Sequence, residues 1–203
     1  MQNASKSILL VLCLAVGCGT GDVPKAPPAA PVDLDPADPT ILKRPFTAEE
    51  IRDEWIPGLR ILMRRTTPEG TQLERWTVMA ADNEGAEIEY AMIADDASVD
   101  GEPQVKRSTW VELRDHASFP AARSSRDWVS RSTPLGDFEG WLYRVEDPEA
   151  AAVQEYFFVP DLPGAPVQMR ILEGEITVFE LEQTARLRPE GHSTATVDTP
   201  VDR

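Results

Sequence analysis

The chain has 203 residues and a formal net charge of −15, with 35 acidic against 20 basic side chains. Because such a surface repels phosphate, the composition argues against nucleic-acid binding and against adsorption of the protein surface to anionic lipid headgroups. The length suits a single folded domain with tails.

An apolar run near the N-terminus predicts export. Residues 8–16 are apolar and follow Lys6, which is the arrangement of a secretory signal and is shorter than the ~20 residues that span a bilayer. Small residues then lead to Cys18. This segment resembles the lipobox of bacterial lipoproteins, although Ala15 stands where leucine is usual. The resemblance implies that residues 1–17 are a signal peptide and that Cys18 is acylated.

This resemblance also predicts a location and a partner. Gly19 follows the lipidated cysteine, whereas an aspartate at this place retains such lipoproteins in the inner membrane. We therefore expect the periplasmic face of the outer membrane, with the inner membrane or the cell surface as alternatives. The expected membrane contact is the lipid anchor. Since Cys13 leaves with the signal peptide and Cys18 carries lipid, no disulfide is expected in the remaining chain, whose formal charge is −16.

Composition divides the rest of the chain into three parts. Residues 18–45 contain many prolines and show no apolar periodicity, which predicts an extended linker after the lipidated cysteine. Residues 46–185 show the regular patterns of a folded domain. Residues 186–203 are polar with proline and glycine, and we expect a disordered tail.

Two capping-box patterns predict short helices in the domain. Thr47 and Glu50 mark the first, which is expected to end near Trp55 before a Pro-Gly pair. Thr109 and Glu112 mark the second, expected over residues 110–118.

Most of the domain alternates apolar and polar residues with a period of two. Such segments lie near residues 59–64, 75–80 and 87–92, and again after residue 128, separated by Pro- and Gly-containing turns. An acidic loop is expected over residues 95–102. At least seven such strands with two helices predict an α+β fold, a curved antiparallel sheet on short helices.

The last part of the domain resembles a known group of proteins. The segment Thr133-Pro-Leu-Gly-Asp-Phe138, the proline-rich connection over residues 160–167 and the closing hairpin are similar to the end of half-barrel periplasmic proteins. These are the lipoprotein-carrier (LolA/LolB-like) group and related secreted proteins. The resemblance implies a half-barrel whose concave side forms an apolar pocket for acyl chains. It assigns no single functional residue.

Aromatic residues of the strands are the candidate ligand-binding residues. If they share the concave face, they either line such a pocket or simply fill an ordinary core, which is the commoner role of large aromatics. The candidates are Trp76, Tyr90, Trp141, Tyr143, Tyr156 and Phe158.

No arrangement in the sequence predicts catalysis, a metal or a cofactor. His116 lies near Glu112 and Asp115, but this spacing is common by chance, and a surface or capping role is the favoured interpretation. Ser125 lacks the strand-turn-helix surroundings of a nucleophile, and His192 lies in the expected tail.

Together these patterns predict a non-catalytic, lipid-anchored protein of the cell envelope that binds an apolar or peptidic ligand, such as a lipid or a lipoprotein. A structural or scaffolding role in the envelope is the first alternative. A hydrolase that combines His116 with carboxylates or Ser125 is the second.

Overall fold

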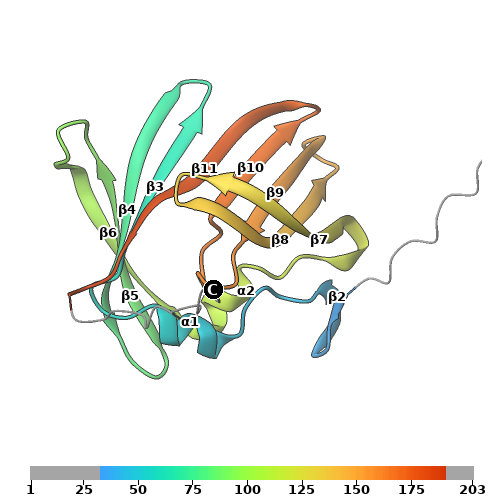
Figure 1. Ribbon diagram of the computed structural model, residues 1–203, viewed down its shortest axis with the longest axis horizontal. Coiled ribbons are helices and arrows are strands. Elements are labelled where there is room, and N and C mark those ends of the chain that lie inside the picture. The colour runs from blue at the N-terminus through green and yellow to red at the C-terminus, as the bar shows by residue number, and fades with distance from the viewer. Residues whose placement is uncertain (1–32, 191–203) are drawn as a thin grey trace, which may run out of the picture. The chain divides into compact units, whose positions relative to one another are not determined.

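The computed structural model describes residues 33–190, which form one large sheet, a small hairpin and two short α-helices (Figure 1). The elements in chain order are β1 (Leu34–Asp35), β2 (Asp38–Leu42), α1 (Ala48–Glu54), β3 (Arg60–Thr67), β4 (Gly70–Ala81), β5 (Gly85–Ile93), β6 (Val99–Thr109), α2 (Trp110–Asp115), the short 3-10 helix η1 (Ala121–Arg123), β7 (Ser124–Thr133), β8 (Gly136–Asp147), β9 (Ala152–Phe158), β10 (Gln168–Glu173) and β11 (Ile176–Leu187).

The large sheet has nine antiparallel strands in the order β6-β5-β4-β3-β11-β10-β9-β8-β7. Strands β3 to β6 form one meander and β7 to β11 a second, and β11 returns to pair with β3. Consequently β6 and β7, which are consecutive in the chain, are opposite edges of the sheet. Figure 1 shows the strands arching over α1 and α2. The predicted curved antiparallel sheet of an α+β half-barrel is confirmed.

Both helices begin at the capping boxes that the sequence predicts. The Thr47 amide donates to Glu50 Oε2 at 2.7 Å, and the Glu50 amide donates to Thr47 Oγ1 at 3.1 Å. Thr109 and Glu112 make the same reciprocal pair at 2.8 and 3.1 Å. Because each box satisfies two free amides, it fixes where these short helices start.

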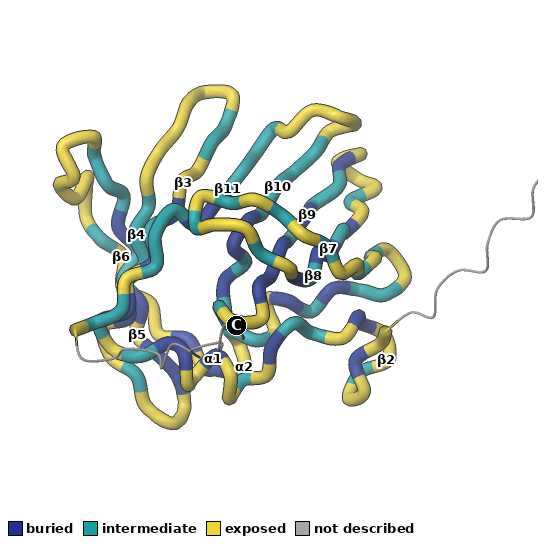
Figure 2. The backbone as a smooth tube through the Cα atoms, in the orientation of Figure 1, coloured by how far each residue is buried: buried dark blue, intermediate teal, exposed yellow. Residues whose placement is uncertain are grey.

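Large apolar side chains fill most of the space between the sheet and the helices. Ile51 of α1 and Trp110 of α2 are almost fully buried there. Phe119, which follows α2, packs against Tyr143 and Tyr156 of the sheet with ring centroids 4.8 Å apart in both pairs. In Figure 2 the buried segments lie where the strands approach the helices, and the hairpin tips are exposed.

Strand β6 replaces the second half of the acidic loop expected over residues 95–102. It begins at Val99 and pairs with β5 along its length, with a register shift opposite Tyr90 and Met92. As an edge strand it exposes nearly all its side chains, so it carries no alternating apolar pattern. Gly101 and Pro103 are tolerated because β6 is an edge strand.

The ends of the fold also differ from the expected boundaries. Residues 34–42, expected to belong to the linker, form the β1–β2 hairpin, and the buried Leu42 donates its amide hydrogen to Phe119 O at 2.9 Å. At the other end Arg186 belongs to β11, and its guanidinium forms a buried ion pair with Glu54 at 3.0 Å. These tertiary contacts order segments whose local composition suggested none. The expected signal peptide, Cys18, most of the linker and the tail beyond residue 190 lie outside the described residues.

The far part of the β7–β8 hairpin folds over the outer face of the sheet. Arg131 of β7 reaches Gln168 on β10 and Glu155 on β9, both at 2.7 Å, although β8 separates β7 from these strands. A second, small core lies beneath the hairpin around Leu142 and Phe157. The sheet therefore buries side chains on both faces in this region, rather than on the concave face alone.

Gly140 allows this fold-over, because a Cβ atom there would lie 2.2 Å from the carbonyl oxygen of Phe158. We predict that Gly140→Ala lowers the free energy of unfolding by more than about 2 kcal/mol, since neighbouring backbone must move. Urea denaturation measures the change. Glu139→Ala, an exposed substitution one residue earlier, is the matched control. Equal stabilities of the two variants would contradict the steric explanation.

Glu155 stabilises the folded hairpin as a carboxylate. Burial opposes its ionisation, but hydrogen bonds from Arg131 and Arg144 outweigh burial and hold the pKa of Glu155 below its usual value of 4.5. A lowered pKa contributes stability that is complete above the usual value and is lost as the pH falls through the folded-state value.

We therefore predict that Glu155→Gln destabilises the protein by about 2 kcal/mol at neutral pH, because two guanidinium groups lose their anionic partner. The difference from the wild type should shrink as the pH is lowered below about 4. Urea denaturation at a series of pH values checks this. Glu146→Gln, an exposed change in the same sheet, serves as the control. A difference that stays constant with pH would contradict the assignment.

Candidate functional site

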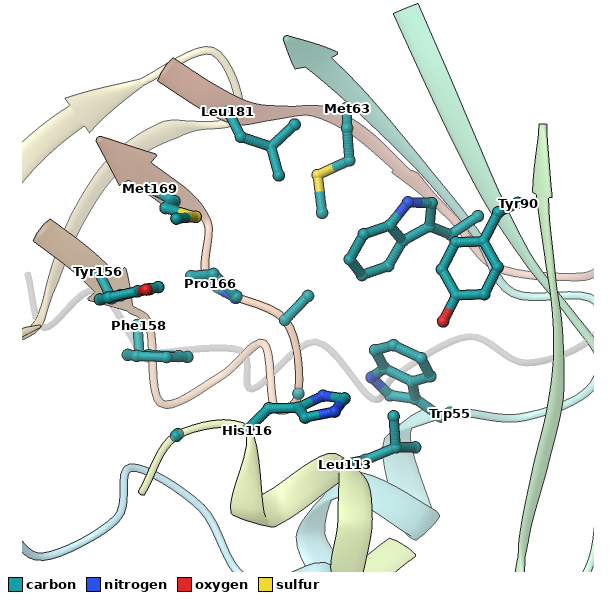
Figure 3. A pocket seen from close by; sticks show the side chains of 14 residues that line it. Trp55, Met63, Tyr90, Leu113, His116, Tyr156, Phe158, Pro166, Met169 and Leu181 are labelled. Atoms are coloured by element: carbon teal, nitrogen blue, oxygen red, sulfur yellow. The ribbon is translucent and has the colours of Figure 1, made fainter. Parts of the chain in front are cut away.

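A cavity of about 220 Å³ remains between the concave face of the sheet and the helices (Figure 3). Its wall is almost wholly apolar and comes from α1, α2, the β9–β10 connection and six strands. The residues that line it are Trp55, Met63, Trp76, Tyr90, Leu113, His116, Ala117, Tyr156, Phe158, Gly164, Ala165, Pro166, Met169 and Leu181.

Strand alternation supplies one wall of the cavity. Trp76 and Tyr90 lie directly opposite each other on β4 and β5, and their rings meet edge to face with centroids 5.3 Å apart. Tyr156, Met169 and Leu181 are paired in turn across β9, β10 and β11, so they form one row across the sheet. Neighbouring residues in register share a face, which explains how distant segments build a continuous wall.

Trp55, just after α1, forms the opposite wall and is held by the β9–β10 connection. Its indole nitrogen donates to Pro163 O at 2.9 Å. Gly164 lies directly against the indole, and a Cβ at this glycine would be 2.2 Å from Nε1. With a φ of +111°, the position also has a backbone conformation that favours glycine. The proline-rich connection is therefore part of the cavity wall.

Three polar atoms of the lining are satisfied within the protein. Besides Trp55, the Trp76 indole donates to Glu74 Oε1 at 2.7 Å, and the Tyr156 hydroxyl donates to Gln154 Oε1 at 2.6 Å. Burial raises the pKa of Tyr156 and, together with the nearby Glu74 carboxylate, that of Tyr90. Both phenols are therefore neutral at physiological pH.

The structure brings together four of the six aromatic residues named from the sequence. Trp76, Tyr90, Tyr156 and Phe158 line the cavity. Tyr143 instead lies in the closed core, fully buried, where its hydroxyl donates to Lys43 O at 2.6 Å.

Trp141 also lies outside the cavity. It stacks on the Arg126 guanidinium, whose central carbon is 3.4 Å from the ring centroid, and meets Trp128 edge to face. It shares the alternation phase of Tyr143, but both lie on β8, one strand beyond the cavity wall, which extends only to β9. Position across the sheet, rather than phase, separates the two groups, because Trp141 and Tyr143 on β8 pair directly with the cavity residues Phe158 and Tyr156 on β9.

Several lining residues escaped the sequence reasoning. Trp55 comes from the end of α1 and His116 from the C-cap of α2, and neither position belongs to the strand pattern. Met63 and Met169 did belong to that pattern, at positions in phase with other buried residues. Because the candidate ligand-binding residues were restricted to aromatic side chains, the two methionines were not among them.

His116 does not form a site with its neighbouring carboxylates. Glu112 is engaged by the Thr109 capping box, and Asp115 pairs with Arg44 at 3.3 Å and Arg114 at 2.8 Å. Within residues 33–190, no group of three His, Cys, Asp or Glu side chains could hold a metal ion. His116 instead lies at the cavity, exposed to solvent.

Ser125 is placed away from these groups. It lies on β7, opposite Arg144 of β8, in a segment that the sequence suggested to be a polar loop. It is not among the residues that line the cavity.

None of the helices among the described residues is long and apolar enough to cross a membrane.

Comparisons with known proteins give similarity of fold only. No known family matches the sequence, and no curated protein matches it. A chain of the Pseudomonas aeruginosa MucA/MucB complex is 11% identical with a TM-score of 0.47, over 69% of this chain and 53% of that one. This chain thus spans about half of that chain's length.

Two further solved structures have names that refer to export or lipoproteins. An exported protein with a YmcC-like fold from Bacteroides fragilis is 10% identical with a TM-score of 0.40, over 66% of this chain and 99% of that one. A domain named for outer membrane lipoprotein sorting, from Vibrio parahaemolyticus, is 10% identical with a TM-score of 0.27, over 72% and 91% of the two chains. The likenesses stay at the level of fold, and no family is identified.

Proposed function

We propose that this protein is a non-catalytic, lipid-anchored protein of the cell envelope that binds an apolar ligand in the cavity under its sheet. The observation that carries the proposal is the cavity itself, about 220 Å³ with an almost wholly apolar wall. Close packing is the rule in protein interiors, so a void of this size between sheet and helices calls for an occupant.

The size of the cavity restricts the ligand. An apolar cavity of about 150 Å³ already takes up benzene, whereas pockets for drug-sized molecules measure about 300–1,000 Å³. The volume of 220 Å³ lies between them. It suits one aliphatic chain or a small ring system, and it is too small for the two chains of a phospholipid.

The wall can also adapt to such a ligand. Met63 and Met169 face the cavity from different strands, and methionine side chains are flexible and polarisable. Each buried methylene of a ligand contributes about 0.8 kcal/mol, so even one short chain gains substantial affinity without a polar contact. Binding of this kind requires no catalytic group.

The predicted lipid anchor determines where in the cell envelope the protein would bind its ligand. Acylation of Cys18 and a proline-rich linker before the folded domain would hold the cavity near a membrane without fixing its orientation. A tethered domain does not travel as a free carrier. It acts locally, as an acceptor or a chaperone of apolar chains, and Gly19 favours the outer membrane as the place.

Filling the cavity should weaken binding. We predict that the full chain carrying Cys18→Ser binds the apolar fluorophore phenylnaphthylamine, and that a further Ala117→Leu change weakens binding by more than about tenfold, because the added side chain occupies the cavity. Fluorescence titration measures the affinity. Ala80→Leu, an exposed substitution on β4, is the matched control. Equal weakening by both changes, or no binding by the parent chain, would refute the proposal.

The anchor has a separate test. We predict that cells fed labelled palmitate incorporate the label into the wild-type chain and that Cys18→Ser abolishes incorporation, because the thiol is the attachment point. The wild-type protein should partition with membranes and the variant with the soluble fraction. Labelling that persists in the variant would remove the lipid anchor from the proposal and leave the cavity unaffected.

A further inference from the structure

Two polar side chains of the cavity lack a partner within the described protein. The Tyr90 hydroxyl and the His116 imidazole make no hydrogen bond with any of residues 33–190, whereas the polar atoms of Trp55, Trp76 and Tyr156 are all engaged. In Figure 3 the Tyr90 hydroxyl points down toward Trp55, and the His116 ring projects from α2 into the same space. The cavity therefore has two free hydrogen-bonding groups, one on β5 and one at the C-cap of α2.

The lining carries no permanently charged side chain. None of the residues that line the cavity is a lysine, arginine, aspartate or glutamate. The Glu74 carboxylate, which accepts a hydrogen bond from Trp76, acts electrostatically on Tyr90, and Glu112 lies one helical turn before His116. An anionic ligand group would meet these carboxylates and no lysine or arginine of the lining.

We propose that Tyr90 and His116 recognise an uncharged oxygen acceptor at the end of the apolar ligand, as in the carbonyl group of a carboxylic ester. A phenol O–H and an imidazole N–H can each donate a hydrogen bond to such a carbonyl oxygen. The inference rests on the proposed apolar cavity and names the chemical class of its ligand. Tyr90 and His116 are then the residues that determine specificity.

Exposure of the two residues orients the ligand. His116 is exposed at the end of α2, while Met63, on β3, is fully buried. The ester thus lies at the rim, beside Tyr90 and His116, and the chain extends inward toward the methionine and leucine side chains of β3, β10 and β11 (Figure 3). This arrangement keeps the polar group close to water and buries the hydrocarbon.

The test uses the full chain carrying Cys18→Ser and four competitors of similar length against phenylnaphthylamine: methyl decanoate, decanol, decanoic acid and undecane. We expect methyl decanoate to bind more tightly than both undecane and decanoic acid. Tyr90→Phe and His116→Leu should each reduce its advantage over undecane by about three- to tenfold, the usual value of one hydrogen bond. Tyr143→Phe removes a hydroxyl outside the cavity and should leave that advantage intact.

Each other outcome is decisive. Preference for decanoic acid would show that the site selects a carboxylate and would overturn the inference. Equal affinity for ester and hydrocarbon, or an unchanged ratio in both variants, would do the same while leaving the apolar cavity in place. Failure of every competitor and of the fluorophore would instead refute the proposed function. A decanol affinity equal to that of the ester would replace the ester carbonyl with a hydroxyl and also contradict the inference.

Discussion

The architecture depends on one constraint, that the chain must pass from one edge of the sheet to the other. Strands β6 and β7 are consecutive, yet they are the two outermost strands. The segment between them, with α2 and η1, crosses the concave side and carries Trp110 and Phe119 into the core. Sheet curvature, burial of the concave face and the existence of a cavity all follow from this crossing.

The crossing covers the sheet unevenly, and side-chain size determines where space remains. Phe119 and Tyr143 close the core on the side of β8 and β9. Elsewhere the covering segments contribute the small residues Ala117, Gly164 and Ala165 as well as the large Trp55. Since the strand side chains cannot reach across, a void persists there. The balance between large and small residues on the covering segments thus separates ordinary core from candidate site.

Local signals predicted what local interactions determine. The capping boxes at Thr47 and Thr109 and the alternation of the inner strands depend on a few neighbouring residues, and the helices and most strands were predicted from them. Edge strand β6 and the hairpin at residues 34–42 are held by pairing and tertiary contacts, so their composition resembled loop or linker. The candidate aromatics pair across neighbouring strands, but which of them meet the cavity depends on how far across the sheet the cavity extends, which no local pattern encodes.

A cavity persists only if its walls cannot collapse into it, and the aromatic residues around this one are restrained at their polar ends. Hydrogen bonds to Pro163, Glu74 and Gln154 hold the rings of three of them. Swinging any of these rings inward would leave a buried donor unpaired, which costs about 1–3 kcal/mol. Tyr90 has no such restraint on its hydroxyl, but its ring is packed edge to face against the held Trp76. The same hydrogen bonds that satisfy the wall therefore keep the space open, and they leave Tyr90 and His116 free to meet a ligand.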